Sequence, residues 1–100
     1  YGVMGPVKAA LEAAVRYAAS ELGPKGISVH ALSPGPLKTR AASGIAEFDE
    51  LLDDAAKRAP THHLATIEDT GAYAAFLASR EAFNVTGGVH PIDGGYSIIG

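Results

Sequence analysis

A long helical repeat that runs directly into a strand restricts the fold of this chain most. From Val3 to Leu22 an apolar residue recurs every three or four positions, which predicts one long amphipathic helix. Gly23-Pro24 should end it, the glycine as a left-handed cap and the proline because it cannot continue a helix. Ile27–Leu32 follows with the alternation of a short strand. This succession is typical of an α/β protein with a parallel sheet.

Two more helices and a second strand are predicted downstream. An amphipathic helix with apolar residues at Phe48, Leu51 and Leu52 should end near Ala59-Pro60. Thr66-Ile-Glu-Asp69 has the pattern of a capping box and opens a third helix. The last strand is Val89–Ile92, and Pro91 places it at a sheet edge or a bulge. The buried side of the third helix should comprise Ile67, Ala74, Phe76, Leu77 and Ala78.

The two strands, joined by a helical crossover, should be parallel and right-handed. Two strands do not make a stable doubly wound sheet alone. In addition, the helical pattern begins at once, at a tyrosine and without a cap. We therefore expect the chain to be the carboxy-terminal portion of a larger α/β domain.

Composition excludes several function classes. A chain of 100 residues with 47% hydrophobic and 19% charged residues is ordinary for one globular domain. The eight basic residues are outnumbered by eleven acids, which disfavours nucleic-acid binding. There is no cysteine and no apolar run long enough to span a membrane, so disulfides, thiolate metal sites and membrane partners are not expected. A cytoplasmic location is the default.

Tyr1 and Lys8 form the first candidate functional pair. Seven residues make almost two helical turns, so the two side chains share one face with roughly 10 Å of rise between them. They could flank one small molecule. A frayed first residue beside a solvated lysine is the alternative for such a pair taken alone.

Ser33–Thr39 is the second candidate region. This proline- and glycine-containing loop follows the first strand, and ligands in open α/β sheets bind just past the carboxyl ends of strands. An ordinary turn is the alternative. The histidines give weaker signals. His62 and His63 are adjacent and lack partners at zinc-ligand spacing, so no metal is expected, and His30 and His90 are interpreted as packed or partly exposed ring residues.

Five motifs in order carry a family resemblance. They are Tyr1-x6-Lys8, Ser33–Thr39, Arg40–Ile45, Thr66–Asp69 and Asp93–Ser97. Together they resemble the carboxy-terminal part of bacterial type I enoyl-[acyl-carrier-protein] reductases, a divergent branch of the short-chain dehydrogenase/reductases. The resemblance covers the whole chain. It implies that residues 1–100 are the carboxy-terminal part of a single Rossmann-like reductase domain, with the amino-terminal dinucleotide-binding part absent.

The resemblance implies a reaction and a set of site residues. Members reduce the trans-2 double bond of enoyl-acyl-carrier-protein thioesters in fatty-acid synthesis with NADH, NADPH remaining open, and a homotetramer is expected. Lys8 would bind the nicotinamide-ribose hydroxyls, and Tyr1 would donate to the enolate oxygen. Gly35, Pro36 and Leu37 would border the nicotinamide, Thr39 would lie near the cofactor phosphates, and Ala41, Ala42, Ile45 and Phe48 would line the acyl chain.

Spacing separates this branch from the others. Ordinary short-chain reductases resemble one another in a Tyr-x3-Lys pair one helical turn apart, which suits reduction at a carbonyl carbon. The two-turn spacing here suits an enoyl thioester, because hydride arrives two carbons away from the oxygen that collects the charge. A ketone or alcohol reductase, or a non-catalytic fragment that serves assembly, remains the alternative. The acidic second helix disfavours docking of an acidic carrier protein there and leaves Lys38, Arg40, Lys57 and Arg58 as basic candidates.

Overall fold

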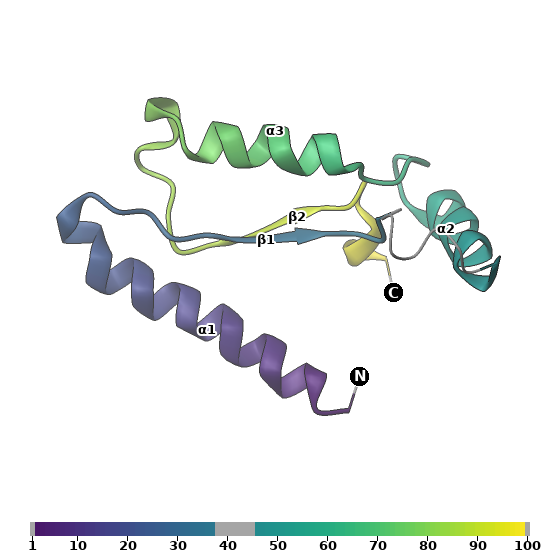
Figure 1. Ribbon diagram of the computed structural model, residues 1–100, viewed down its shortest axis with the longest axis horizontal. Coiled ribbons are helices and arrows are strands. Elements are labelled where there is room, and N and C mark those ends of the chain that lie inside the picture. Colours follow the sequence, from purple (N-terminus) through teal and green to yellow (C-terminus); the bar gives the residue numbers. More distant parts are fainter. Residues whose placement is uncertain (1, 38–45, 100) are drawn as a thin grey trace. The chain divides into compact units, whose positions relative to one another are not determined.

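The computed structural model describes residues 2–37 and 46–99 of the chain (Figure 1). Helix α1, strand β1, helices α2 and α3 and strand β2 follow one another, which confirms the predicted order. The chain divides into two compact units. The first contains the chain up to Ala31 together with Ala75–His90, and the second contains Leu32–Ala74 together with the chain from Pro91 onward. In the described part, every helix falls short of the length and apolarity needed to cross a membrane.

Helix α1 comprises Met4–Leu22, as the apolar repeat predicts. Its end differs from the prediction. Gly23 is right-handed, with φ −53°, and begins a 3-10 turn, η1 (Gly23–Lys25). The left-handed residue is Gly26, with φ 76°. Pro24 explains the shift, because a proline is tolerated in the first turn of a helix and allows the chain to tighten for one more turn before it reverses.

Strand β1 comprises Ala31–Pro34, so the predicted strand over Ile27–Leu32 is placed too early. Irregular pairing precedes it: the amide of Val29 donates to the Thr86 hydroxyl at 2.9 Å, and the amide of Gly87 donates to the Val29 carbonyl at 2.9 Å. A side chain thus replaces a backbone partner before the regular ladder begins at Ala31. The strand position was set by this distant partner, which local alternation does not reveal.

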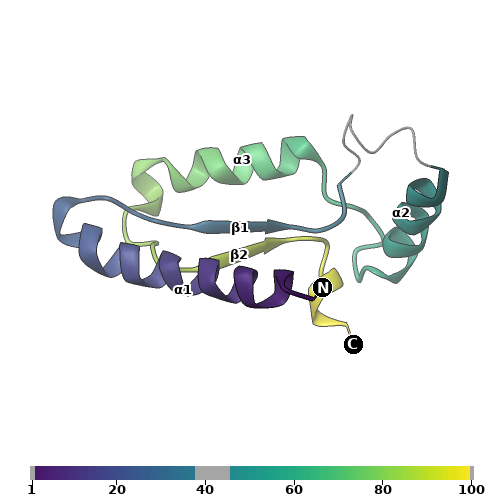
Figure 2. The same cartoon turned by 60° about the horizontal axis from the view of Figure 1, so that its bottom comes forward.

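Strand β2 comprises Val89–Ile92 and pairs with β1 in a two-stranded sheet. The amide of Ala31 donates to the Gly88 carbonyl and the amide of Gly35 donates to the Ile92 carbonyl, both at 3.1 Å. Both bonds have the same offset along the chain, so the strands are parallel, and both arrows point the same way in Figures 1 and 2. The prediction of a parallel pair is confirmed.

Two prolines are accommodated by the alternation of the strands. Ala31 and Gly35 direct their amides toward β2, so the position of the missing N–H at Pro34 points away from β2. Ile92 directs its carbonyl toward β1, so the adjacent Pro91 likewise faces away from β1. Among the described residues β2 pairs with β1 alone, which agrees with the predicted edge position of Pro91.

Helices α2 (Ala46–Arg58) and α3 (Ile67–Leu77) lie close to their predicted positions. The capping box of α3 is present: the Asp69 amide donates to the Thr66 hydroxyl, and the Thr66 amide donates to the Asp69 carboxylate, both at 3.0 Å. Each partner satisfies a group that the first helical turn leaves without an intrahelical bond.

Few side chains are buried. In the first unit they are Val15, Ala19, Leu77 and Ala82, and in the second Leu52, Ala55 and Ala59. The expected buried side of α3 is wrong apart from Leu77, since Ile67 is 58% exposed and Phe76 is 46% exposed. The stripe of α1 is likewise open at Val3, Val7 and Leu11. Two strands offer too little surface to cover three helices, so these apolar faces find no cover among the described residues.

Candidate functional site

The first two residues of the predicted loop, Ser33 and Pro34, belong to β1, so the irregular segment begins at Gly35, in the second unit. Gly35, Pro36 and Leu37 are all partly buried. The Gly35 amide donates to the Ile92 carbonyl at 3.1 Å, which ties the start of the loop to the end of β2. A Cβ added to Gly35 would lie 2.9 Å from the Cβ of Asp93 and 3.3 Å from its Cα. Only glycine allows this close approach of two backbones.

Asp93-Gly94-Gly95 forms a tight corner after β2. The Asp93 carboxylate accepts hydrogen bonds from the Gly95 amide at 2.9 Å and the Ser97 amide at 3.0 Å. A hydrogen bond from the Ser97 side chain is the main reason why the pKa of Asp93 is lowered; burial opposes it, and the Gly95 and Ser97 amides lower the pKa further. Gly94 and Gly95 have φ of 63° and 88°. The carboxylate therefore fixes a backbone shape that only these glycines adopt without strain.

The other side of the corner contacts the segment after α2. The Thr61 amide donates to the Gly94 carbonyl at 3.1 Å. A Cβ on Gly94 would overlap the Thr61 hydroxyl, and one on Gly95 would lie 2.8 Å from Cγ of Pro60. Nearby, the Arg58 guanidinium lies 5.9 Å from the centroid of the Tyr96 ring. The corner is thus packed between the loop after β1 and the end of α2.

The predicted acyl-chain residues are only partly described. Phe48 lies in the first turns of α2 and is half-buried. Ala41, Ala42 and Ile45 lie outside the described residues, and so does the predicted cofactor residue Thr39. Their assignment stays a prediction.

Lys8 lies in the second turn of α1, in the first unit, with an exposed side chain. Tyr1 lies outside the described residues, so the distance between the phenol and the ammonium stays a prediction. Helix α1 begins only at Met4 and Gly2 has φ 44°, so the regular helix that the shared-face argument assumes from Tyr1 to Lys8 is present only from Met4 onward.

A histidine pair that sequence reasoning missed lies beside the start of β1. Nδ1 of His30 lies 3.0 Å from Nε2 of His90, and the ring centroids are 5.0 Å apart. Desolvation chiefly, and the charge of His90 secondarily, lower the pKa of His30. The parallel register aligns Ala31 with Val89, so His30 and His90 are diagonal neighbours on adjacent segments, and only knowledge of this register would have predicted the pair. Both rings are in contact and partly buried, as expected for packed or partly exposed ring residues.

The remaining two histidines, His62 and His63, belong to the second unit. His62 has φ 60°, and its Nδ1 lies 3.1 Å from the Lys57 carbonyl oxygen. The His63 amide donates to the Thr61 hydroxyl. Across residues 2–37 and 46–99, no three His, Cys, Asp or Glu side chains are grouped as metal ligands.

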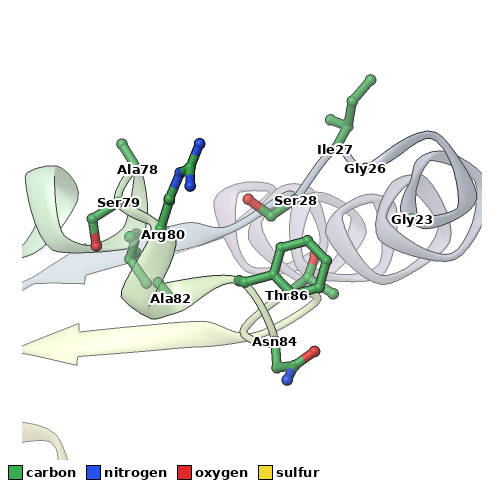
Figure 3. A pocket seen from close by; sticks show the side chains of 12 residues that line it. Gly23, Gly26, Ile27, Ser28, Ala78, Ser79, Arg80, Ala82, Asn84 and Thr86 are labelled. Atoms are coloured by element: carbon green, nitrogen blue, oxygen red, sulfur yellow. The ribbon is translucent and has the colours of Figure 1, made fainter.

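A half-open cavity of about 440 Å³ lies in the first unit, between the turn after α1 and the segment after α3 (Figure 3). None of the predicted site residues lines it. Figure 3 shows the side chains of Arg80 and Asn84 directed to opposite sides, so these two polar groups do not converge on one point. The loop and corner of the second unit are therefore the better candidate site.

Comparison with known proteins decides the family. A model of the enoyl-(acyl carrier protein) reductase family matches residues 1–97. The chain belongs to this family. The resemblance carried by the five sequence motifs is thereby confirmed.

Two curated relatives illustrate the likeness. The NADH-dependent enoyl-[acyl-carrier-protein] reductase FabI of Neisseria meningitidis is 49% identical over 98 residues, which are 98% of this chain and 38% of that protein. The protein of the same name from Escherichia coli is 48% identical over 98 residues, 98% of this chain and 37% of the relative. The chain thus spans less than two fifths of the length of these enoyl reductases.

Solved structures confirm the Rossmann-like α/β fold. The Bacillus cereus enoyl-acyl carrier protein reductase, crystallised with NADP+ and an indole naphthyridinone, matches with a TM-score of 0.89 and 45% identity, covering 100% of this chain and 39% of that chain. The enzyme of Anaplasma phagocytophilum in complex with NAD matches with a TM-score of 0.88 and 41% identity, covering 100% of this chain and 38% of that one. Both are enoyl reductases described with a nicotinamide dinucleotide.

Proposed function

We propose that the protein carrying this chain reduces the trans-2 double bond of enoyl-acyl-carrier-protein thioesters in fatty-acid synthesis, with NADH as the reductant. The observation that carries the proposal is the Gly35–Leu37 loop, which follows the carboxyl end of a parallel strand and is bonded to the neighbouring strand at Ile92. The family match over residues 1–97 and relatives named for NADH support the same reaction.

The loop fits the nicotinamide end of such a cofactor. Gly35, Pro36 and Leu37 carry no charge and are partly buried, which suits the face of an aromatic ring better than a phosphate. The crowded contact of Gly35 with Asp93 brings the loop backbone as close to the strand end as a main chain allows. Thr39, beyond this loop, is assigned to the phosphates.

Lys8 and Tyr1 carry the chemistry in this proposal. NADH supplies the hydride that the β-carbon receives. The Lys8 ammonium donates to the ribose hydroxyls, and its charge favours the enolate that develops. The Tyr1 phenol donates to the thioester oxygen, where the negative charge collects. Ala41, Ala42, Ile45 and Phe48 are assigned to the wall of the acyl site.

The proposal extends to assembly and location. The alanine-rich α1 supports a homotetramer, because its small side chains let a helix of another copy approach closely. We place the reaction in the cytoplasm, where a bacterial carrier protein and NADH are both available.

The test compares variants of the complete protein with crotonyl thioester and NADH. Tyr1→Phe should lower kcat by about 100-fold, since it removes one donor to the developing oxyanion. Lys8→Ala should lower kcat and also weaken NADH binding measured by calorimetry. Lys25→Ala, which removes an exposed lysine of η1, is the matched control and should change neither quantity.

Three outcomes contradict the proposal. Unchanged activity in both Tyr1→Phe and Lys8→Ala removes the roles assigned to them. A preference for acetoacetyl over crotonyl thioester indicates a ketone reductase instead. A complete protein without dinucleotide binding indicates a role in assembly only.

A further inference from the structure

The Asp93 corner has no role in the reaction described so far, yet the predicted cofactor loop is packed directly against it. Asp93 follows β2, and its two carboxylate oxygens accept the amides of Gly95 and Ser97 at 2.9 and 3.0 Å. Charged hydrogen bonds of this kind are stronger than neutral ones and geometrically specific. The position of the Asp93 main chain is therefore defined by its own side chain.

Gly35 lies in very close contact with Asp93. Its amide is bonded to the carbonyl of Ile92, the residue before Asp93, and a Cβ on it would meet Asp93 at 2.9 Å. Such spacing leaves no slack, so a displacement of the Asp93 backbone must displace Gly35 or break its bond to Ile92. The contact joins residues far apart in sequence.

The corner cannot relax away from the loop, because its opposite side is also occupied. The Gly94 carbonyl accepts the Thr61 amide, and Gly95 packs against Pro60. The segment after α2 thus closes the side of the corner that Gly35 does not cover. A change at Asp93 is transmitted to the loop instead of being absorbed by solvent.

We propose that Asp93 is a positioning residue that sets the Gly35-Pro36-Leu37 loop for the nicotinamide end of the cofactor. The inference rests on the proposed function, because it assumes that this loop borders the nicotinamide. In this role Asp93 would act without contacting cofactor or substrate. The Asp93 carboxylate holds the Gly94-Gly95 turn in place, and the Cα and Cβ of Asp93 pack against Gly35.

The first experiment measures NADH binding and steady-state kinetics of the complete protein with Asp93→Asn and Asp93→Ala. Asp93→Ala removes both acceptors, and we expect NADH affinity to fall about tenfold, equivalent to about 1.4 kcal/mol. Asp93→Asn keeps one oxygen acceptor and the side-chain volume, so it should retain part of the affinity. In both variants the KM for NADH should rise more than the KM for the crotonyl thioester.

The matched control is Asp53→Asn, which removes an exposed carboxylate from α2. It should leave NADH affinity unchanged. A folded Asp93→Asn variant with wild-type NADH affinity overturns the positioning role, even if its melting temperature is lower. If the wild-type protein itself binds no NADH, the proposed function fails. This outcome is seen before any variant is compared, so it is distinguished from a failure of the positioning role alone.

A second experiment tests the contact with Gly35 directly. Gly35→Ala places a methyl group against Asp93 and should weaken NADH binding by about tenfold, the equivalent of about 1.4 kcal/mol. In an Asp93→Gly background the opposing Cβ is gone, so the same Gly35→Ala change should have a smaller effect. Strict additivity of the two changes contradicts a transmitted contact.

Discussion

Nδ1 of His30 lies 3.0 Å from Nε2 of His90, so one of these nitrogens donates a hydrogen bond to the other. Nε2 of His30 is buried and has no hydrogen-bond partner among the described residues. An orphaned acceptor is less unfavourable than an orphaned N–H donor. The tautomer we assign therefore has Nδ1–H of His30 donating to Nε2 of His90, with Nε2 of His30 unprotonated.

This pair predicts acid sensitivity near neutral pH. The pKa of His30 in the folded protein lies below its ordinary value of about 6.5, so the unfolded chain binds more protons in the interval between the two. The stability that the neutral ring contributes is complete above about pH 6.5 and is lost as the pH falls toward the folded value. Urea unfolding followed from about pH 8 to about pH 5 should show a steeper loss of unfolding free energy for the wild type than for His30→Asn. Equal pH dependence of the two proteins would contradict a contribution from the His30–His90 pair, and His63→Asn serves as the control.

Asp93 predicts a second, more acidic transition. Its folded pKa is lowered, chiefly by the hydrogen bond from Ser97, so its contribution is present above the ordinary aspartate value of about 3.9 and is lost as the pH falls through the folded value. Unfolding followed by circular dichroism below about pH 4 should therefore depend less on pH in Asp93→Asn. Asp53→Asn should behave as the wild type, and a parallel acid profile for Asp93→Asn would contradict the assignment.

Gly26 predicts a loss of stability when the turn after α1 receives a side chain. Apart from its chain neighbours, no atom lies near enough to obstruct a methyl group on Gly26. Gly26→Ala should destabilise the protein by about 1 kcal/mol, because Gly26 is left-handed. Gly23 is right-handed but precedes Pro24, whose Cδ disfavours a Cβ on a preceding helical residue, so Gly23→Ala should also destabilise the protein. Urea denaturation of both variants provides the measurement, and a Gly26→Ala protein as stable as the wild type would contradict the effect assigned to the left-handed backbone.

The capping box predicts a modest, chemically specific loss. Thr66→Ala removes the hydroxyl that accepts the Asp69 amide and should cost about 1 kcal/mol of unfolding free energy. Thr66→Ser keeps the oxygen and should retain most of the stability. The comparison by chemical denaturation isolates the hydroxyl, since equal losses in the two variants would assign the effect to the methyl group.

Local patterns predicted what local interactions determine. The period of α1 and the Thr66–Asp69 box were readable because their partners are at most a few residues apart. The start of β1 was misplaced because Thr86 and Gly88, far along the chain, decide where the ladder begins. The Gly35–Asp93 and His30–His90 contacts have the same origin: they depend on strand register, which no single segment encodes. Burial on α3 was wrong at Ile67 because the described chain supplies no surface to cover it.

The outward-facing prolines govern which further strands the sheet accepts. A strand added beside β1 finds no N–H donor at Pro34, and one added beside β2 finds none at Pro91. Any added ladder must therefore lose a bond, bulge or end at that position. Each free edge is a poor template for indiscriminate strand addition, so a pair of strands with this much uncovered apolar surface is protected against aggregation through its edges.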